Sequence, residues 1–134
     1  MTVRKKYGAI AALAVYLAAV ILLCLIRPDS LPQVQMSLFG IPTDKVVHFL
    51  FFLPYPVLTW LALNEAGHSR KRKLLTAILI FLSGTAIAAG TEVLQSLTDY
   101  RDSDITDLVA DCIGLMTGIA IICILSLSLQ RRIK

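Results

Sequence analysis

Four long apolar segments constrain this chain more than any other feature of its sequence. The chain has 134 residues, 57% of them hydrophobic, and its mean hydropathy is +0.75. A helix that crosses a bilayer needs about 20 predominantly apolar residues, and each segment is close to that length. The sequence therefore predicts an all-α membrane protein, a four-transmembrane-helix bundle in which residues 1–134 form one integral domain, with helices over about residues 8–26, 45–63, 74–96 and 105–129.

The basic residues predict how these helices are oriented. Ten of the thirteen lysines and arginines lie at the N-terminus, between the second and third helices, or at the C-terminus. With four spans, these three places share one side of the membrane, and the positive-inside rule assigns that side to the cytoplasm. We therefore expect both termini to be cytoplasmic. Contact with anionic lipid headgroups accounts for the net charge of +4, so we expect a lipid bilayer and no nucleic acid as partner.

The acidic residues gather on the opposite side. Eight of the nine lie in or near the two outer loops. Asp104, Asp107 and Asp111 have an i, i+3, i+7 spacing, so they share one face of the fourth helix. An aspartate at the centre of a bilayer helix costs roughly 2.5–3.5 kcal/mol, and such residues usually face the interior of a bundle. We therefore expect this face to be turned away from lipid.

Polar residues on the second and third helices lie at a similar depth. Asp44 and His48 are one helical turn apart. Glu92 and Gln95 share a face of the third helix. Lys45 is rotated away from Asp44 by about 100°, so we expect it to extend to the membrane interface. Because these groups all lie in the outer third of the bilayer, we predict one outward-facing hydrated pocket lined by Asp44, Lys45, His48, Glu92, Gln95, Arg101, Asp104, Asp107 and Asp111.

Small residues and prolines lie deeper in the same helices. Gly114 and Gly118 continue the acidic stripe of the fourth helix, and their G-x-x-x-G spacing permits close approach of a neighbouring backbone. Pro54 and Pro56 lack a backbone N–H, so we expect them to bend the second helix. The sequence thus predicts polar groups above a closely packed, bent region.

Three stretches resemble the VanZ-like family of bacterial membrane proteins. They are DKVVHF at residues 44–49, EVLQSL at residues 92–97, and RDSDITDLVADCIGLMTG at residues 101–118. Asp111 stands where that family often has asparagine. The family is named for a protein associated with reduced susceptibility to teicoplanin, a lipid-bearing glycopeptide antibiotic. The resemblance implies a multi-pass protein of the bacterial cytoplasmic membrane with a role at the cell envelope.

Charge arithmetic favours a bound cation and leaves three interpretations open. The predicted pocket has five carboxylates against Lys45 and Arg101, with His48 able to add one positive charge. It can bind an envelope lipid, wall precursor or lipoglycopeptide, and so modulate susceptibility to glycopeptide antibiotics. Alternatively, it is a metal-dependent membrane enzyme that acts on a lipid-linked phosphoryl or acyl substrate, although no H-E-x-x-H, G-x-S-x-G or P-loop motif is present. The candidate ligands of such a divalent metal are His48, Glu92, Asp107 and Asp111. Alternatively, the polar cluster is purely structural.

Overall fold

The computed structural model describes residues 3–25, 37–38, 40–63, 69–98 and 104–132. Its four long apolar helical spans confirm the predicted membrane-protein architecture: Lys6–Leu25, Thr43–Leu63, Arg70–Ser96 and Ile105–Ser126. The helices themselves are α1 (Val3–Leu25), α2 (Thr43–Phe52), α3 (Pro54–Leu63), α4 (Arg70–Ser96) and α5 (Ile105–Arg132). The second span therefore consists of two helices, α2 and α3.

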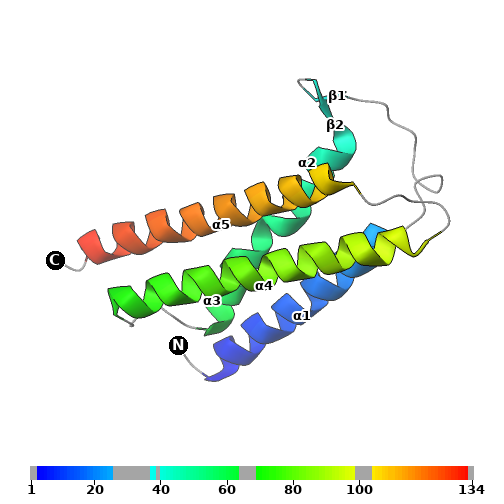
Figure 1. Ribbon diagram of the computed structural model, residues 1–134. Coiled ribbons are helices and arrows are strands. Elements are labelled where there is room, and N and C mark those ends of the chain that lie inside the picture. Colours follow the sequence, from blue (N-terminus) through cyan, green and yellow to red (C-terminus); the bar gives the residue numbers. More distant parts are fainter. Residues whose placement is uncertain (1–2, 26–36, 39, 64–68, 99–103, 133–134) are drawn as a thin grey trace.

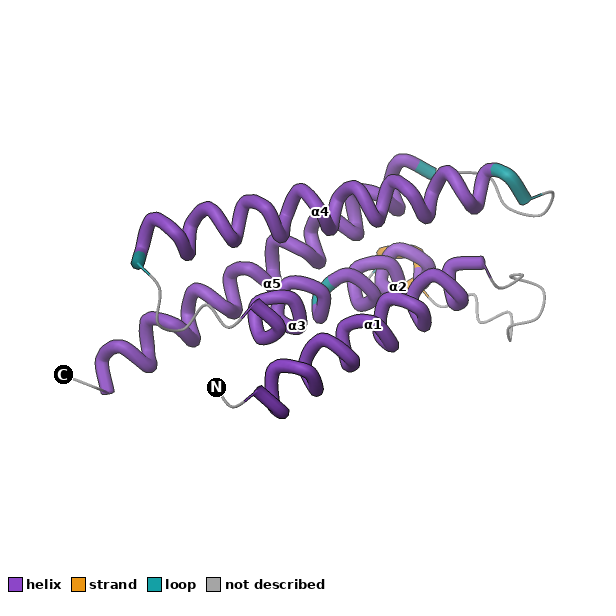
Figure 2. Tube along the Cα trace, turned by 90° about the horizontal axis from the view of Figure 1, so that it is seen from below, coloured by secondary structure: helices purple, strands orange, loops and turns teal. Residues whose placement is uncertain are grey.

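The helices form one bundle whose two ends differ. The beginning of α1 and the end of α5 lie at the same end of the bundle, together with the beginning of α4 (Figure 1). The beginnings of α2 and α5 lie at the opposite end. In the view of Figure 2, α2 and α3 follow one another as a single broken span, which contacts α1 through α3 and contacts α5 along both halves. The beginning of α1 and the end of α5 thus share one end of the bundle, and the cytoplasmic location of both termini stays a prediction.

The break between α2 and α3 lies at Leu53, where the sequence predicted a bend. Pro54 and Pro56 cannot donate backbone hydrogen bonds to the preceding turn, which interrupts the helix. The backbone N–H of Leu53 still donates to the carbonyl of Phe49 at 3.1 Å. One carbonyl in this region, that of Phe51, accepts a hydrogen bond from the hydroxyl of Tyr16 on α1. The bend is confirmed, and a tyrosine from another helix stabilises it.

Two glycines of α5 pack directly against this break. A Cβ atom added at Gly118 would lie 2.5 Å from the carbonyl oxygen of Leu53 and 2.9 Å from the ring of Pro56. A Cβ atom at Gly114 would collide with the carbonyl oxygen of Phe49. The predicted close approach is therefore confirmed, and only glycine fits these two positions without movement of the neighbouring backbone.

The all-α prediction missed one short pair of strands. β1 (Ser37–Leu38) and β2 (Ile41–Pro42) pair antiparallel just before α2. Gly40 has a φ of +83°, a conformation that glycine adopts without steric cost, and so permits the turn. Two-residue strands are too short to give a hydrophobic alternation that sequence inspection can detect.

The core of the bundle is small, as lipid-embedded packing allows. Its buried members include Phe52 and Tyr55 from the broken span, Ile80 and Ala88 from α4, and Leu115 from α5. Many other large apolar side chains are exposed, particularly along α4 and α5. Such outward apolar faces suit a hydrocarbon environment, where helices associate through close packing rather than through burial from water.

Candidate polar site at one end of the bundle

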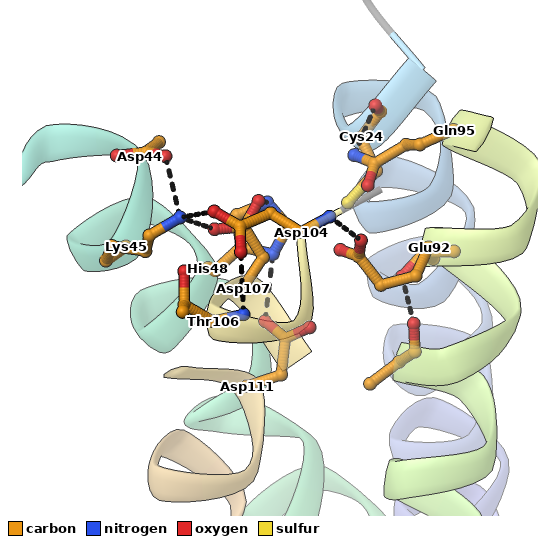
Figure 3. A network of polar contacts seen from close by, with 12 residues as sticks. Cys24, Asp44, Lys45, His48, Glu92, Gln95, Asp104, Thr106, Asp107 and Asp111 are labelled. Carbon is orange, nitrogen blue, oxygen red and sulfur yellow. Dashed lines mark hydrogen bonds and ion pairs between the residues drawn. The ribbon is translucent and has the colours of Figure 1, made fainter. Parts of the chain in front are cut away.

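Lys45 lies at the centre of an ion-pair cluster where α2 meets α5. Its Nζ atom donates to Asp44 Oδ2 at 3.1 Å, to Asp104 Oδ2 at 2.6 Å and also to Asp107 Oδ1 (Figure 3). Lys45 was predicted to line the pocket and to extend to the membrane interface, and here three carboxylates hold its ammonium group. We call these four residues the outer group. The side chains of Asp44 and Asp104 are 48% and 46% exposed, so this group is accessible from the end of the bundle.

Asp104 also fixes the start of α5. Its Oδ1 atom accepts the backbone N–H of Thr106 at 2.8 Å, which is the bond that an N-cap residue makes. Its other carboxylate oxygen accepts the bond from Lys45, and that bond holds the pKa of Asp104 below its usual range. The negative charge of Asp107 in the first turn also suits the positive end of the helix dipole. Local capping thus places two acids beside Lys45.

A second set of side chains lies deeper, and we call it the inner group: His48, Glu92 and Asp111. They come from α2, α4 and α5, and are only 2%, 7% and 0% exposed. His48 Nδ1 lies 3.1 Å from Asp111 Oδ1. One potential ligand atom from each of the three residues lies within 4.8 Å of the other two.

Asp107, a member of the outer group, also contacts the inner group. One of its oxygens is bound by Lys45, and the other lies 3.6 Å from His48 Nε2. His48 is therefore flanked by a carboxylate at each ring nitrogen, with Asp111 at Nδ1 and Asp107 at Nε2. A carboxylate on either side can orient the imidazole ring and select its tautomer.

Two further bonds tie the site to the ends of neighbouring helices. Glu92 Oε2 accepts the backbone N–H of Asp104 at 3.1 Å, which connects α4 to the start of α5. Gln95 Nε2 donates to the backbone carbonyl of Cys24 at 2.9 Å, near the end of α1. Gln95 was predicted to line the pocket, but its amide N–H contacts α1 rather than either group. This bond could not be predicted from residue types, since its acceptor is a backbone atom.

Several buried oxygens in this region have no hydrogen-bond partner among the described residues. They are Glu92 Oε1, Gln95 Oε1 and Asp111 Oδ2. A buried polar atom without a partner is costly, and each case calls for an explanation such as a bound ion or water. Two of the three belong to the inner group, which makes that group the chemically incomplete part of the site.

The structure brings most of the predicted residues together. Seven form the two connected groups, with Asp107 touching both: Asp44, Lys45, His48, Glu92, Asp104, Asp107 and Asp111. Arg101 lies outside the described residues. Within the described part, five carboxylates therefore face one ammonium group, a formal excess of four negative charges when His48 is neutral. This imbalance makes the site suitable for a cation and unsuitable for a bare anion.

Comparison with known proteins agrees with the motifs that line this site. Residues 8–126 match the family described as VanZ/LLP1, and this range contains the segments at residues 44–49, 92–97 and 101–118 that carry the resemblance. No curated protein and no solved structure matched the chain. Because the match covers most of the chain, and because the motif residues converge in one place, the chain belongs to the VanZ/LLP1 family.

Proposed function

We propose that this VanZ/LLP1 protein binds the cationic head of an amphipathic envelope molecule at the outer group. The observation that carries the proposal is the excess of carboxylates over cations in the described part of the polar site. Lys45 already demonstrates the chemistry, since its ammonium group is held by three carboxylates. A ligand amine that enters from the exposed side of Asp44 and Asp104 would compete with Lys45 for the same oxygens.

The orientation of the bundle supports an envelope role. Four basic residues at the beginning of α4, residues 70–73, lie at the end opposite the polar site. The positive-inside rule assigns them to the cytoplasm, so the polar site faces outward across the bacterial cytoplasmic membrane. An outward site is accessible to wall precursors, to lipids of the outer leaflet and to antibiotics.

Exposed apolar side chains next to the acids favour an amphipathic ligand. Ile41 and Val47 flank Asp44 in sequence, and Ile105 follows Asp104 directly. All three are exposed, so a molecule whose head reached the acids could lay an alkyl chain along the adjoining helices. A lipoglycopeptide antibiotic or an amine-bearing lipid has this shape, and binding one would change the susceptibility of the cell to glycopeptide antibiotics.

A second candidate is a metal-dependent enzyme that acts on a lipid-linked phosphoryl or acyl substrate. The specific observation in its favour is that His48 lies among carboxylates within a small buried space. Such an enzyme would need its metal ion to bind a phosphate, because the acids alone repel a phosphate group. Turnover of a lipid-linked phosphate by purified, metal-loaded protein would favour this candidate over simple binding.

The binding proposal can be tested with a matched pair of probes. Dodecylamine and dodecyl phosphate have the same chain and opposite head charge, and their binding to the protein in nanodiscs can be measured by calorimetry. We expect dodecylamine to bind saturably and dodecyl phosphate not to bind. Asp107→Asn, which preserves side-chain shape, should weaken the binding of dodecylamine at least tenfold. Ser96 lies at the end of α4 nearest the polar site but outside both groups, so the control Ser96→Ala should bind the amine normally.

Cells provide the second half of the test. Expression of the protein should lower susceptibility to teicoplanin, and Asp107→Asn should abolish that effect at equal protein abundance. Equal amine binding by Asp107→Asn, at normal abundance, would instead contradict binding at the outer group.

A further inference from the structure

The two groups of the polar site differ in whether a basic side chain neutralises their carboxylates. The outer group contains Lys45, whose ammonium is bound by its three acids. Among the described residues, no lysine or arginine pairs with Glu92 or Asp111. Both carboxylates are more than nine-tenths buried, and each has one oxygen without a hydrogen-bond partner in the described structure. The inner group thus has acceptors that lack a cation.

We propose that the inner group binds one divalent metal ion through His48, Glu92 and Asp111. The ligand atoms of these residues lie within 4.8 Å of one another. Two ligands of a tetrahedral zinc ion at bond lengths near 2.1 Å are separated by roughly 3.4 Å, so shifts of about 1 Å in the side chains complete the site. The pair His48 Nδ1 and Asp111 Oδ1, at 3.1 Å, already has a suitable spacing.

Asp107 was a candidate metal ligand in the sequence analysis, but its contacts give it a different role. Its Oδ1 atom is taken by Lys45, and its Oδ2 atom faces the second ring nitrogen of His48 at 3.6 Å. Histidines that bind metal through one ring nitrogen commonly donate the other N–H to a carboxylate, which fixes the tautomer and the ring orientation. We therefore assign Asp107 as a positioning residue that leaves Nδ1 of His48 directed at the metal.

The donor set and the charge narrow the choice of ion. The two negative charges of Glu92 and Asp111, with a neutral imidazole, balance the two positive charges of a divalent cation. Lys45 does not supply this charge, because its ammonium group is bound by the outer acids. One nitrogen and two oxygen ligands suit zinc or manganese, whereas magnesium and calcium are usually bound through oxygen alone. Three protein ligands also leave coordination positions open to water or to a ligand group.

The metal site does not depend on the binding of an amphipathic amine, because the two proposals concern different groups. Amine binding is tested at the three acids around Lys45, of which Asp107 alone also lies beside His48 among the described residues. Metal binding is measured on the protein alone, without any envelope ligand. Failure of one measurement therefore leaves the other intact.

The test is metal analysis of the full-length protein in detergent. After treatment with chelator, the protein is titrated with Zn²⁺ and with Mn²⁺ by calorimetry, and elemental analysis follows desalting. We expect about one ion per chain and a higher melting temperature in the loaded form. His48→Gln, Glu92→Gln and Asp111→Asn should each weaken binding at least tenfold, and Asp107→Asn by about 10- to 100-fold. Asp44→Asn, which alters only the outer group, should bind the ion normally.

Spectroscopy keeps the proposal testable if a buried variant fails to fold. Mn²⁺ bound to the unmodified protein should show hyperfine coupling to a histidine nitrogen in electron spin-echo experiments. His68 is the other histidine of the chain and is not one of the proposed ligands, so His68→Ala should leave that signal intact while His48→Gln removes it. The proposal is overturned if folded protein binds neither ion stoichiometrically, or if His48→Gln and Glu92→Gln retain full metal binding.

Discussion

One face of α5 carries two kinds of residue that meet two different surroundings. Asp107 and Asp111 lie in its first turns, among the polar side chains of α2 and α4. Gly114 and Gly118 continue the same face and meet the backbone of the broken span. The acids can be replaced by amides of the same shape, but the glycines leave no space for any side chain. The residues available for chemistry and those needed for packing therefore occupy successive parts of one helix face, and Asp111 and Gly114 are roughly one helical turn apart.

The largest effect is expected where packing alone is changed. Gly118→Leu adds a branched side chain where even a Cβ atom would lie 2.5 Å from the carbonyl oxygen of Leu53. The neighbouring atoms belong to backbone and to a proline ring, so they cannot rotate away. We expect a destabilisation of about 3 kcal/mol or more, with most of the folded protein lost in size-exclusion chromatography.

Gly90 on α4 provides a matched control for this substitution. It is exposed, and a Cβ atom added there has no other atom within 4 Å. Gly90→Leu should therefore give normal abundance and a normal elution profile. Normal behaviour of Gly118→Leu would show that the close approach of α5 to the broken span does not hold the bundle together.

Replacement of glycine by alanine should change the free energy of unfolding in opposite directions on α5 and on α4. Gly114→Ala places a methyl group against the carbonyl of Phe49 and 3.2 Å from the backbone nitrogen of Leu53, and overpacking of this kind costs about 1–3 kcal/mol. Gly90→Ala meets no such obstacle and should stabilise α4 by about 0.5–1 kcal/mol through helix propensity. Unfolding free energies from detergent titrations measure both values. Stabilisation by both substitutions would remove the packing argument for Gly114.

Much of this separation could be predicted from the sequence. Apolar segments of about 20 residues identify membrane spans without reference to a fold. Helical spacing alone placed Asp107 and Asp111 on the face that continues as Gly114 and Gly118, because that relation is internal to one helix. The prolines identified the bend for the same local reason.

Contacts between helices were harder to predict. Spacing on α2 placed Lys45 about 100° from Asp44 and could not show that its ammonium group binds two acids of α5 as well. The available signal was the charge imbalance, which required a cation somewhere near the acids. The bonds from Gln95 to the Cys24 carbonyl and from Tyr16 to the Phe51 carbonyl had no signal, because their acceptors are backbone atoms that every residue carries.

The smallest effect should come from the exposed edge of the polar site. Asp104→Asn removes the ion pair with Lys45 but keeps a side-chain oxygen that can cap α5 at Thr106, so it isolates the charge. Because the pKa of Asp104 is lower in the folded protein than in the unfolded chain, its charge stabilises the fold at pH values above the ordinary aspartate pKa of about 3.9. That stabilisation is lost as the pH falls further, towards and through the folded-state pKa.

The expected result is a small difference in melting temperature between the unmodified protein and Asp104→Asn. The difference should stay constant from pH 7 to about pH 5 and shrink below about pH 4, since acid protonates the aspartate and leaves asparagine unchanged. It should be small because the side chain is 46% exposed and water screens the pair. Thermal unfolding in detergent across this pH range measures it, with Asp104→Ala as the variant that also loses the cap. A difference in melting temperature that grows on acidification would contradict this. It would mean that the charge of Asp104 destabilises the fold, and that Lys45 stabilises the buried Asp107 rather than Asp104.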